Sequence, residues 1–186
     1  MTYRMVHFSE IGSLRASLQF LAFSEAYLYS AANLCSALAA SPSESTYPRG
    51  AVVLSLSFHS IELFLKAAIL EKVPDEQFAG KAGHDLESLC KRYTNLFPGK
   101  KFEFEIPFRT EEVDLVEPDP RVVDELKTFM AEHKKATPPD QLNRYPRDTE
   151  GNPWNGIYAF EPNTFLPVIS KVQQDVVRLK ELIFNG

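Results

Sequence analysis

The residues with the clearest capacity for chemistry lie along one predicted helix, residues 49–72. Ser55, His59, Glu62 and Lys66 follow one another at spacings of four, three and four, while most other positions of this helix are apolar. At 100° per residue these side chains fall within an arc of about 60°. The polar stripe has three interpretations: a solvent-exposed helix edge with a surface Glu62–Lys66 pair, the floor of a cleft for a polar ligand, or a buried polar network at a dimer interface.

Glu25 and His84 are two further candidates. Glu25 falls within an apolar stripe of a predicted first helix, residues 13–39, where a buried carboxylate needs a cationic partner. His59 or Lys66 is then the expected partner, whereas the simpler interpretation places Glu25 at the edge of the stripe, in contact with water. His84 stands directly before a predicted short helix, where it either caps that helix or lines a cleft.

A second group of candidates is the segment Asn143-Arg144-Tyr145-Pro146-Arg147. The guanidinium of arginine commonly binds phosphate or carboxylate through two parallel hydrogen bonds, and the proline stiffens the backbone between the two arginines. The segment therefore predicts either a positioned contact to an anionic ligand or a salt bridge that anchors the loop.

Metal and nucleophilic chemistry find little support in the sequence. His59-x-x-Glu62 could give two ligands on one helix face, but bundle di-metal sites use Glu-x-x-His twice with two more carboxylates, and that pattern is absent. The chain has no Gly-x-Ser-x-Gly elbow and no phosphate-binding Gly-x-x-x-x-Gly-Lys loop. We therefore expect neither a metal nor another cofactor.

The composition is that of one ordinary globular domain spanning residues 1–186. Hydrophobic residues are 44% and charged residues 24%, and the net charge of −5 argues against a broad nucleic-acid footprint. Cys35 and Cys90 are too few for a disulfide framework and lie among apolar neighbours, which predicts two buried thiols. Polar residues interrupt every candidate signal peptide or membrane span, so we expect a cytoplasmic protein with no membrane contact.

Periodicity predicts an all-α fold. Apolar residues recur at helical spacing over 13–39, 49–72, from Gly83-His84-Asp85 to about Leu96, over 120–135 and over 164–184. Residues 101–106 alternate polar and apolar as a short strand does, and residues 142–160 carry several turn signals. These elements predict an up-and-down four- or five-helix bundle with a small extended or β-hairpin insertion near 100–108 and 142–160.

Two of these segments resemble the HEPN superfamily of helical nucleotide-binding domains. The resemblance lies in Ser60-Ile61-Glu62-Leu63-Phe64-Leu65-Lys66-Ala67, followed by Gly83-His84-Asp85-Leu86, and in the later Asn143-Arg144-Tyr145-Pro146. It implies an up-and-down helical bundle that is often dimeric. Many members of this superfamily are metal-independent RNases of toxin or defence systems, and others bind nucleotides or serve as non-catalytic scaffolds.

The chain departs from the RNase members in one respect, because they carry Arg, four to six residues, then His. Two residues separate Arg4 from His7, nine separate Arg49 from His59, and eleven separate Arg121 from His133. The family's usual catalytic pair is therefore not carried over.

The resemblance and the candidate residues together predict a HEPN-like binding or accessory module, associated with a nucleotide or RNA in a prokaryotic defence or toxin–antitoxin setting. We expect a homodimer with phosphate contacts from Lys66, Arg144 and Arg147 around Tyr145, while Glu62 and His84 orient those groups. One alternative is a divergent metal-independent RNase that uses His59 or His84 with Arg144. Another is a structural scaffold that binds a protein through the aromatic segment 154–165. The sequence leaves open whether the protein is an enzyme, although the missing motif argues against it.

Overall fold

The computed structural model describes residues 5–107, 128, 139–148, 150–154 and 159–185, and this part of the chain is all-α. No β-strand occurs among these residues, so the predicted fold class is confirmed at this level. The helices are α1 (Ser9–Gly12), α2 (Ala16–Ala40), α3 (Tyr47–Lys72), α4 (Leu86–Leu96), α6 (Pro139–Leu142) and α7 (Pro162–Phe184). Short 3₁₀ helices are η1 (Pro42–Glu44), η2 (Lys81–Gly83) and η3 (Lys100–Phe102).

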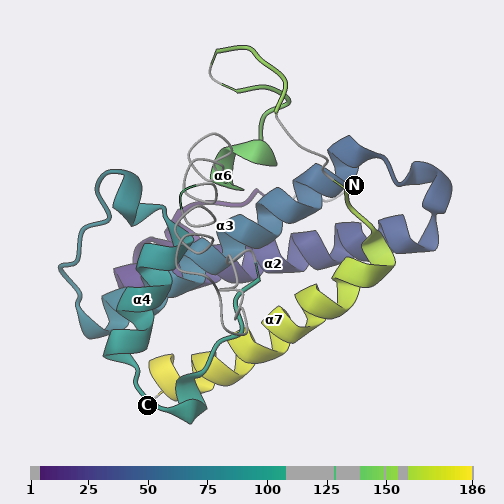
Figure 1. Ribbon diagram of the computed structural model, residues 1–186. Coiled ribbons are helices and arrows are strands. Elements are labelled where there is room, and N and C mark those ends of the chain that lie inside the picture. The colour runs from purple at the N-terminus through teal and green to yellow at the C-terminus, as the bar shows by residue number, and fades with distance from the viewer. Residues whose placement is uncertain (1–4, 108–127, 129–138, 149, 155–158, 186) are drawn as a thin grey trace, which may run out of the picture.

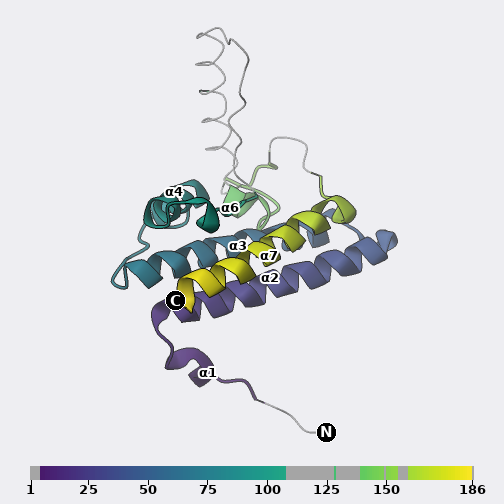
Figure 2. The same ribbon diagram turned by 90° about the horizontal axis from the view of Figure 1, so that it is seen from below.

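Three long helices, α2, α3 and α7, lie side by side, and α4 runs across α3 (Figures 1 and 2). The chain reverses at η1, so α2 and α3 are antiparallel, and α7 runs back along them to end near the start of α2. Figure 2 shows α4 on one side of α3 and both α2 and α7 on the other. The predicted helix over 120–135 lies outside the described residues except for Thr128, which is helical.

α3 is the central helix because its side chains are apolar on nearly every face. Its buried side chains include Ile61, Phe64, Leu65 and Ile69, which pack with buried residues of α2, α4 and α7. By length and composition α3 could cross a membrane. Since 67% of that stretch is buried inside the protein, as in the core helix of a bundle, the composition of α3 leaves the location of the protein open.

The predicted strand at 101–106 is not present. Lys100–Phe102 form η3, and the extended residues that follow are bound by side chains instead of a neighbouring strand. The Tyr93 hydroxyl donates to the carbonyl of Phe102, and Arg178 of α7 donates to the carbonyls of Lys101 and Glu103. These side-chain donors take the place of a sheet partner for the segment.

The second predicted insertion, residues 142–160, shows only an isolated antiparallel bridge, between Arg147 and Pro153, among its described residues. Its predicted Asn155-Gly156 turn lies outside the described part of the chain. The rings of Phe160 and Phe165 pack on each other and against the core, so they are not a free aromatic surface.

Candidate functional site

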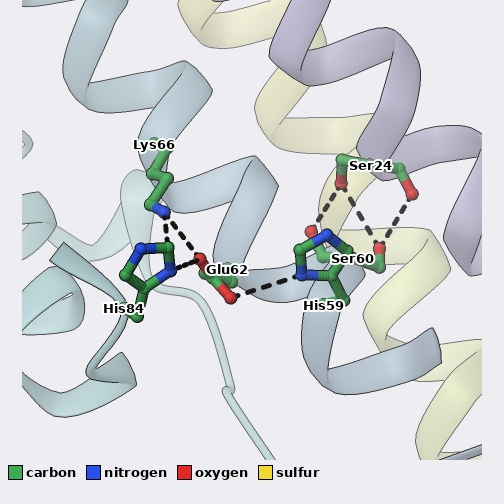
Figure 3. Close-up of polar contacts among 6 residues, drawn as sticks. All are labelled: Ser24, His59, Ser60, Glu62, Lys66 and His84. Carbon is green, nitrogen blue, oxygen red and sulfur yellow. Dashed lines mark hydrogen bonds and ion pairs between the residues drawn. The ribbon is translucent and has the colours of Figure 1, made fainter. Parts of the chain in front are cut away.

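A buried carboxylate, Glu62 of α3, is the centre of the candidate site. Its Oε1 accepts from Lys66 Nζ at 2.6 Å and from His84 Nδ1 at 2.9 Å, and its Oε2 lies 3.3 Å from His59 Nδ1. Figure 3 shows the carboxylate lying between the two imidazole rings. The structure thus brings together four of the predicted candidates, from two separate segments of the chain.

The Glu62–Lys66 pair is buried, which excludes the interpretation of a surface pair. Each side chain is only 5% exposed, and the Lys66 ammonium also lies 5.3 Å from the centre of the Phe78 ring. The Lys66 ammonium donates to Glu62 and lies 3.4 Å from His84 Nδ1, and its side chain is covered, so Lys66 is not placed to contact a ligand. The structure therefore does not support the predicted phosphate contact from Lys66. Lys66 instead holds Glu62.

Glu62 is ionised at neutral pH. Burial raises the pKa of this carboxyl, but hydrogen bonds from His59, Lys66 and His84 and the charge of Lys66 outweigh burial and lower the pKa from 4.5 to about 2. An ionised carboxylate can only accept hydrogen bonds, so both histidines must carry a proton on Nδ1. The other nitrogen of each ring, Nε2, is left for solvent or a ligand.

Both rings are open to the outside. The side chain of His59 is 40% exposed and that of His84 is 59% exposed, whereas Glu62, to which both rings are bound, is buried. A buried acid therefore fixes the tautomer and orientation of two accessible imidazoles. This arrangement suits proton transfer or anion binding at Nε2.

His84 reaches Glu62 because of the turn that precedes α4. Asp85, and not His84, caps α4: its carboxylate accepts from the backbone N–H and the hydroxyl of Ser88. Gly83 packs tightly on the backbone of Phe78, since a Cβ at Gly83 would lie 2.6 Å from the carbonyl of Phe78. The sequence Gly83-His84-Asp85 thus provides a close approach, a contact to the buried acid and a helix cap.

Replacing Gly83 by Ala is expected to lower the free energy of unfolding by about 1–3 kcal/mol, because the added methyl meets backbone atoms that cannot move aside cheaply. Gly12→Ala is the matched control, because its Cβ would stand 3.5 Å from the Phe8 ring, an ordinary contact. Urea unfolding followed by circular dichroism measures both variants. Equal stability of the two variants would contradict the packing assigned to Gly83.

A small cleft lies beside the buried acid. It has a volume of about 150 Å³ and is lined by Tyr27 of α2, by Arg144, which follows α6, and by α3 residues Ser55, Leu56, Phe58, His59 and Glu62. Tyr27 meets His59 edge to face, with ring centres 4.7 Å apart, which further fixes the imidazole. The stripe on α3 is therefore divided, because Ser55 and His59 line a cleft and Lys66 lies in the buried cluster.

Arg144 is the exposed cation of this cleft. Within the described part of the chain its guanidinium has no carboxylate partner and lies 5.7 Å from the centre of the Tyr145 ring. Tyr145 and Arg147 do not line the cleft. The Tyr145 carbonyl accepts from the indole N–H of Trp154, and Arg147 donates to the carbonyl of Gly151, so both belong to the structure of the loop.

Glu25 is not part of the site. Its carboxylate is bound by Lys180 of α7 at 2.7 Å, and both side chains are more than one third exposed. The expected partnership with His59 or Lys66 is wrong, whereas the placement at the edge of the stripe agrees with the structure.

Sequence reasoning missed Tyr27 and the contact between α2 and α3 behind the site. Ser24 and Ser60 each donate to the other's backbone carbonyl across the two helices (Figure 3). Two small hydroxyl side chains allow the helices to approach, and this brings Tyr27 against His59. A tyrosine within an apolar stripe is typical of a core position. The contact of Tyr27 with His59 therefore becomes visible only when the pairing of α2 and α3 is known.

The comparisons with known proteins add no assignment. No family model, curated protein or solved structure matches this chain. Among the described residues, no group of three or more His, Cys, Asp or Glu side chains is placed to hold a metal ion. The site must therefore be interpreted from its own geometry.

Proposed function

We propose that the protein is a HEPN-like binding or accessory module, and that its cleft binds a phosphate-bearing ligand such as a nucleotide or a short RNA. The observation that carries this proposal is Arg144, whose guanidinium has no carboxylate partner among the described residues and which lines the same cleft as the oriented imidazole of His59. Guanidinium and imidazole are the groups that recognise phosphate oxygens. In this proposal Lys66 and Arg147 position other groups and do not contact the ligand.

The chain is proposed to act as a homodimer in the cytoplasm. Apolar side chains on α2 and at the start of α3 stay exposed, among them Phe23, Tyr29 and Val52, and contact with a second copy could cover some of them. Sedimentation velocity tests this part of the proposal, and a monomer at all concentrations would contradict it.

Arg144→Ala is expected to weaken binding of a nucleotide or short RNA by about 10- to 100-fold, because a charge-assisted hydrogen bond contributes roughly 1.5–3 kcal/mol. Calorimetric titration measures the affinity. Arg147→Ala is the matched control: it is an exposed arginine of the same loop, directed at Gly151 instead of the cleft, and its affinity should match that of the wild type. Equal affinity of all three proteins, with intact folding, would contradict the proposed site.

A second candidate function is metal-independent cleavage of RNA. It is favoured by one observation, the two accessible histidines whose Nδ1 atoms are both fixed on Glu62. A histidine held in this way by its Nδ1 keeps Nε2 available for proton transfer to or from a substrate. Cleavage that persists with a chelator and is lost in both His59→Ala and His84→Ala would favour the enzyme over the binding module.

A further inference from the structure

We infer that the cleft takes a single terminal phosphate group, a phosphate monoester at the end of a nucleotide or an RNA strand, and not an internal phosphodiester. The inference rests on the proposed function, because it names the part of the ligand that the cleft of Tyr27, Ser55, His59 and Arg144 accepts.

The size of the cleft limits what enters it. Its volume of about 150 Å³ equals that of an engineered protein cavity that accepts one benzene ring, whereas sites that enclose a drug-sized ligand run from about 300 to 1,000 Å³. One phosphate group, with a phosphorus and four oxygens, fits this space, whereas a whole nucleotide is larger than the cleft. We therefore expect the nucleoside to lie outside the cleft.

The polar groups around the cleft match the free oxygens of a terminal phosphate. The lining residues include Arg144, Ser55, Tyr27 and His59. Their side chains carry a planar guanidinium, a hydroxyl, a phenol and an imidazole. Glu62 also lines the cleft, but its two oxygens are occupied by Lys66, His84 and His59, and the Lys66 charge offsets its own. A bound anion therefore meets no unpaired carboxylate among the described lining residues.

A monoester gains more here than a diester does. It carries up to two negative charges and three free oxygens, against one charge and two free oxygens for a phosphate inside a strand. A phosphate inside a strand also brings a nucleotide on each side of it to a cleft of about 150 Å³. A terminal phosphate brings a nucleotide on one side only.

The state of His59 suits a phosphate monoester as well. Because Nδ1 donates to Glu62, Nε2 is the ring nitrogen that can accept a hydrogen bond from the P–OH group of a phosphate monoester. A phosphodiester anion has no P–OH group to donate.

The test compares five probes by calorimetric titration: AMP, adenosine, and one short RNA with hydroxyl ends, with a 5′-phosphate or with a 3′-phosphate. We expect AMP or the phosphorylated RNA to bind at least 10-fold more tightly than its unphosphorylated counterpart. Preference for AMP alone assigns the phosphate to a free nucleotide, and preference for the RNA end assigns it to a strand. Either preference supports the inference.

Variants separate the cleft from the rest of the protein. Arg144→Lys keeps the charge but loses the fork, and we expect it and His59→Gln to reduce the preference for the phosphorylated probe several-fold. Arg147→Ala should keep the preference. Tight binding of phosphorylated and unphosphorylated probes alike would overturn the inference and leave the proposed function intact, whereas binding of none of the probes would overturn both.

Discussion

Replacing Glu62 by Gln is expected to lower the free energy of unfolding by about 3–5 kcal/mol at neutral pH, since it leaves the Lys66 ammonium buried without its counter-charge. Both side chains are 5% exposed and their N–O distance is 2.6 Å. The neutral amide keeps the size of the side chain, so packing changes little and the loss reports the charge. Urea unfolding followed by circular dichroism at neutral pH measures it.

A second Glu–Lys pair in the same protein provides the control. Glu25 and Lys180 are 2.7 Å apart, but both are more than one third exposed, so Glu25→Gln should change the free energy of unfolding by no more than about 1 kcal/mol. The double variant Glu62→Gln, Lys66→Met should recover most of the stability lost in Glu62→Gln, because it removes the uncompensated charge. A loss in Glu62→Gln as small as that in Glu25→Gln would contradict the buried position of the pair.

Much of the helical framework could be predicted from periodicity. α2, α3, α4 and α7 appear where apolar residues recur at helical spacing, because each of these helices buries a face against its neighbours. The strand predicted from the alternation over 101–106 was wrong, because Phe102, Phe104 and Ile106 face the core without a neighbouring strand. Alternation reports which side chains face inward and does not supply a hydrogen-bonding partner for the backbone.

The site could be predicted only in part. The spacing of Glu62 and Lys66 places them on one helix face, whatever covers that face. Their burial depends on Phe78 and on the segment that leads into α4, which the helical period of α3 does not report. The same holds for Glu25, whose partner is set by the register of α7 against α2, and for Arg144, which reaches the cleft through the position of α6.

The stability of the protein should also fall in acid because of the same carboxylate. The pKa of Glu62 is about 2 in the folded protein against an ordinary value of 4.5. A carboxyl whose pKa is lowered by folding contributes its full stabilisation above the higher value and loses it as the pH falls towards the lower one. Allowing for solvent screening at the partly exposed histidines, we expect about 2–3 kcal/mol to be lost between pH 4.5 and pH 2.

The difference between wild type and Glu62→Gln isolates this contribution from the other acidic groups. Glu161, whose pKa is also about 2 because Thr164 and Asn163 hydrogen-bond to it at the start of α7, titrates equally in both proteins and cancels. Urea unfolding at pH 5, 4, 3 and 2 should therefore show the gap between the two proteins narrowing as the pH falls. A gap that stays constant down to pH 2 would mean that Glu62 is not held ionised by Lys66 and the two histidines, and the oriented imidazoles on which the cleft depends would lose their physical basis.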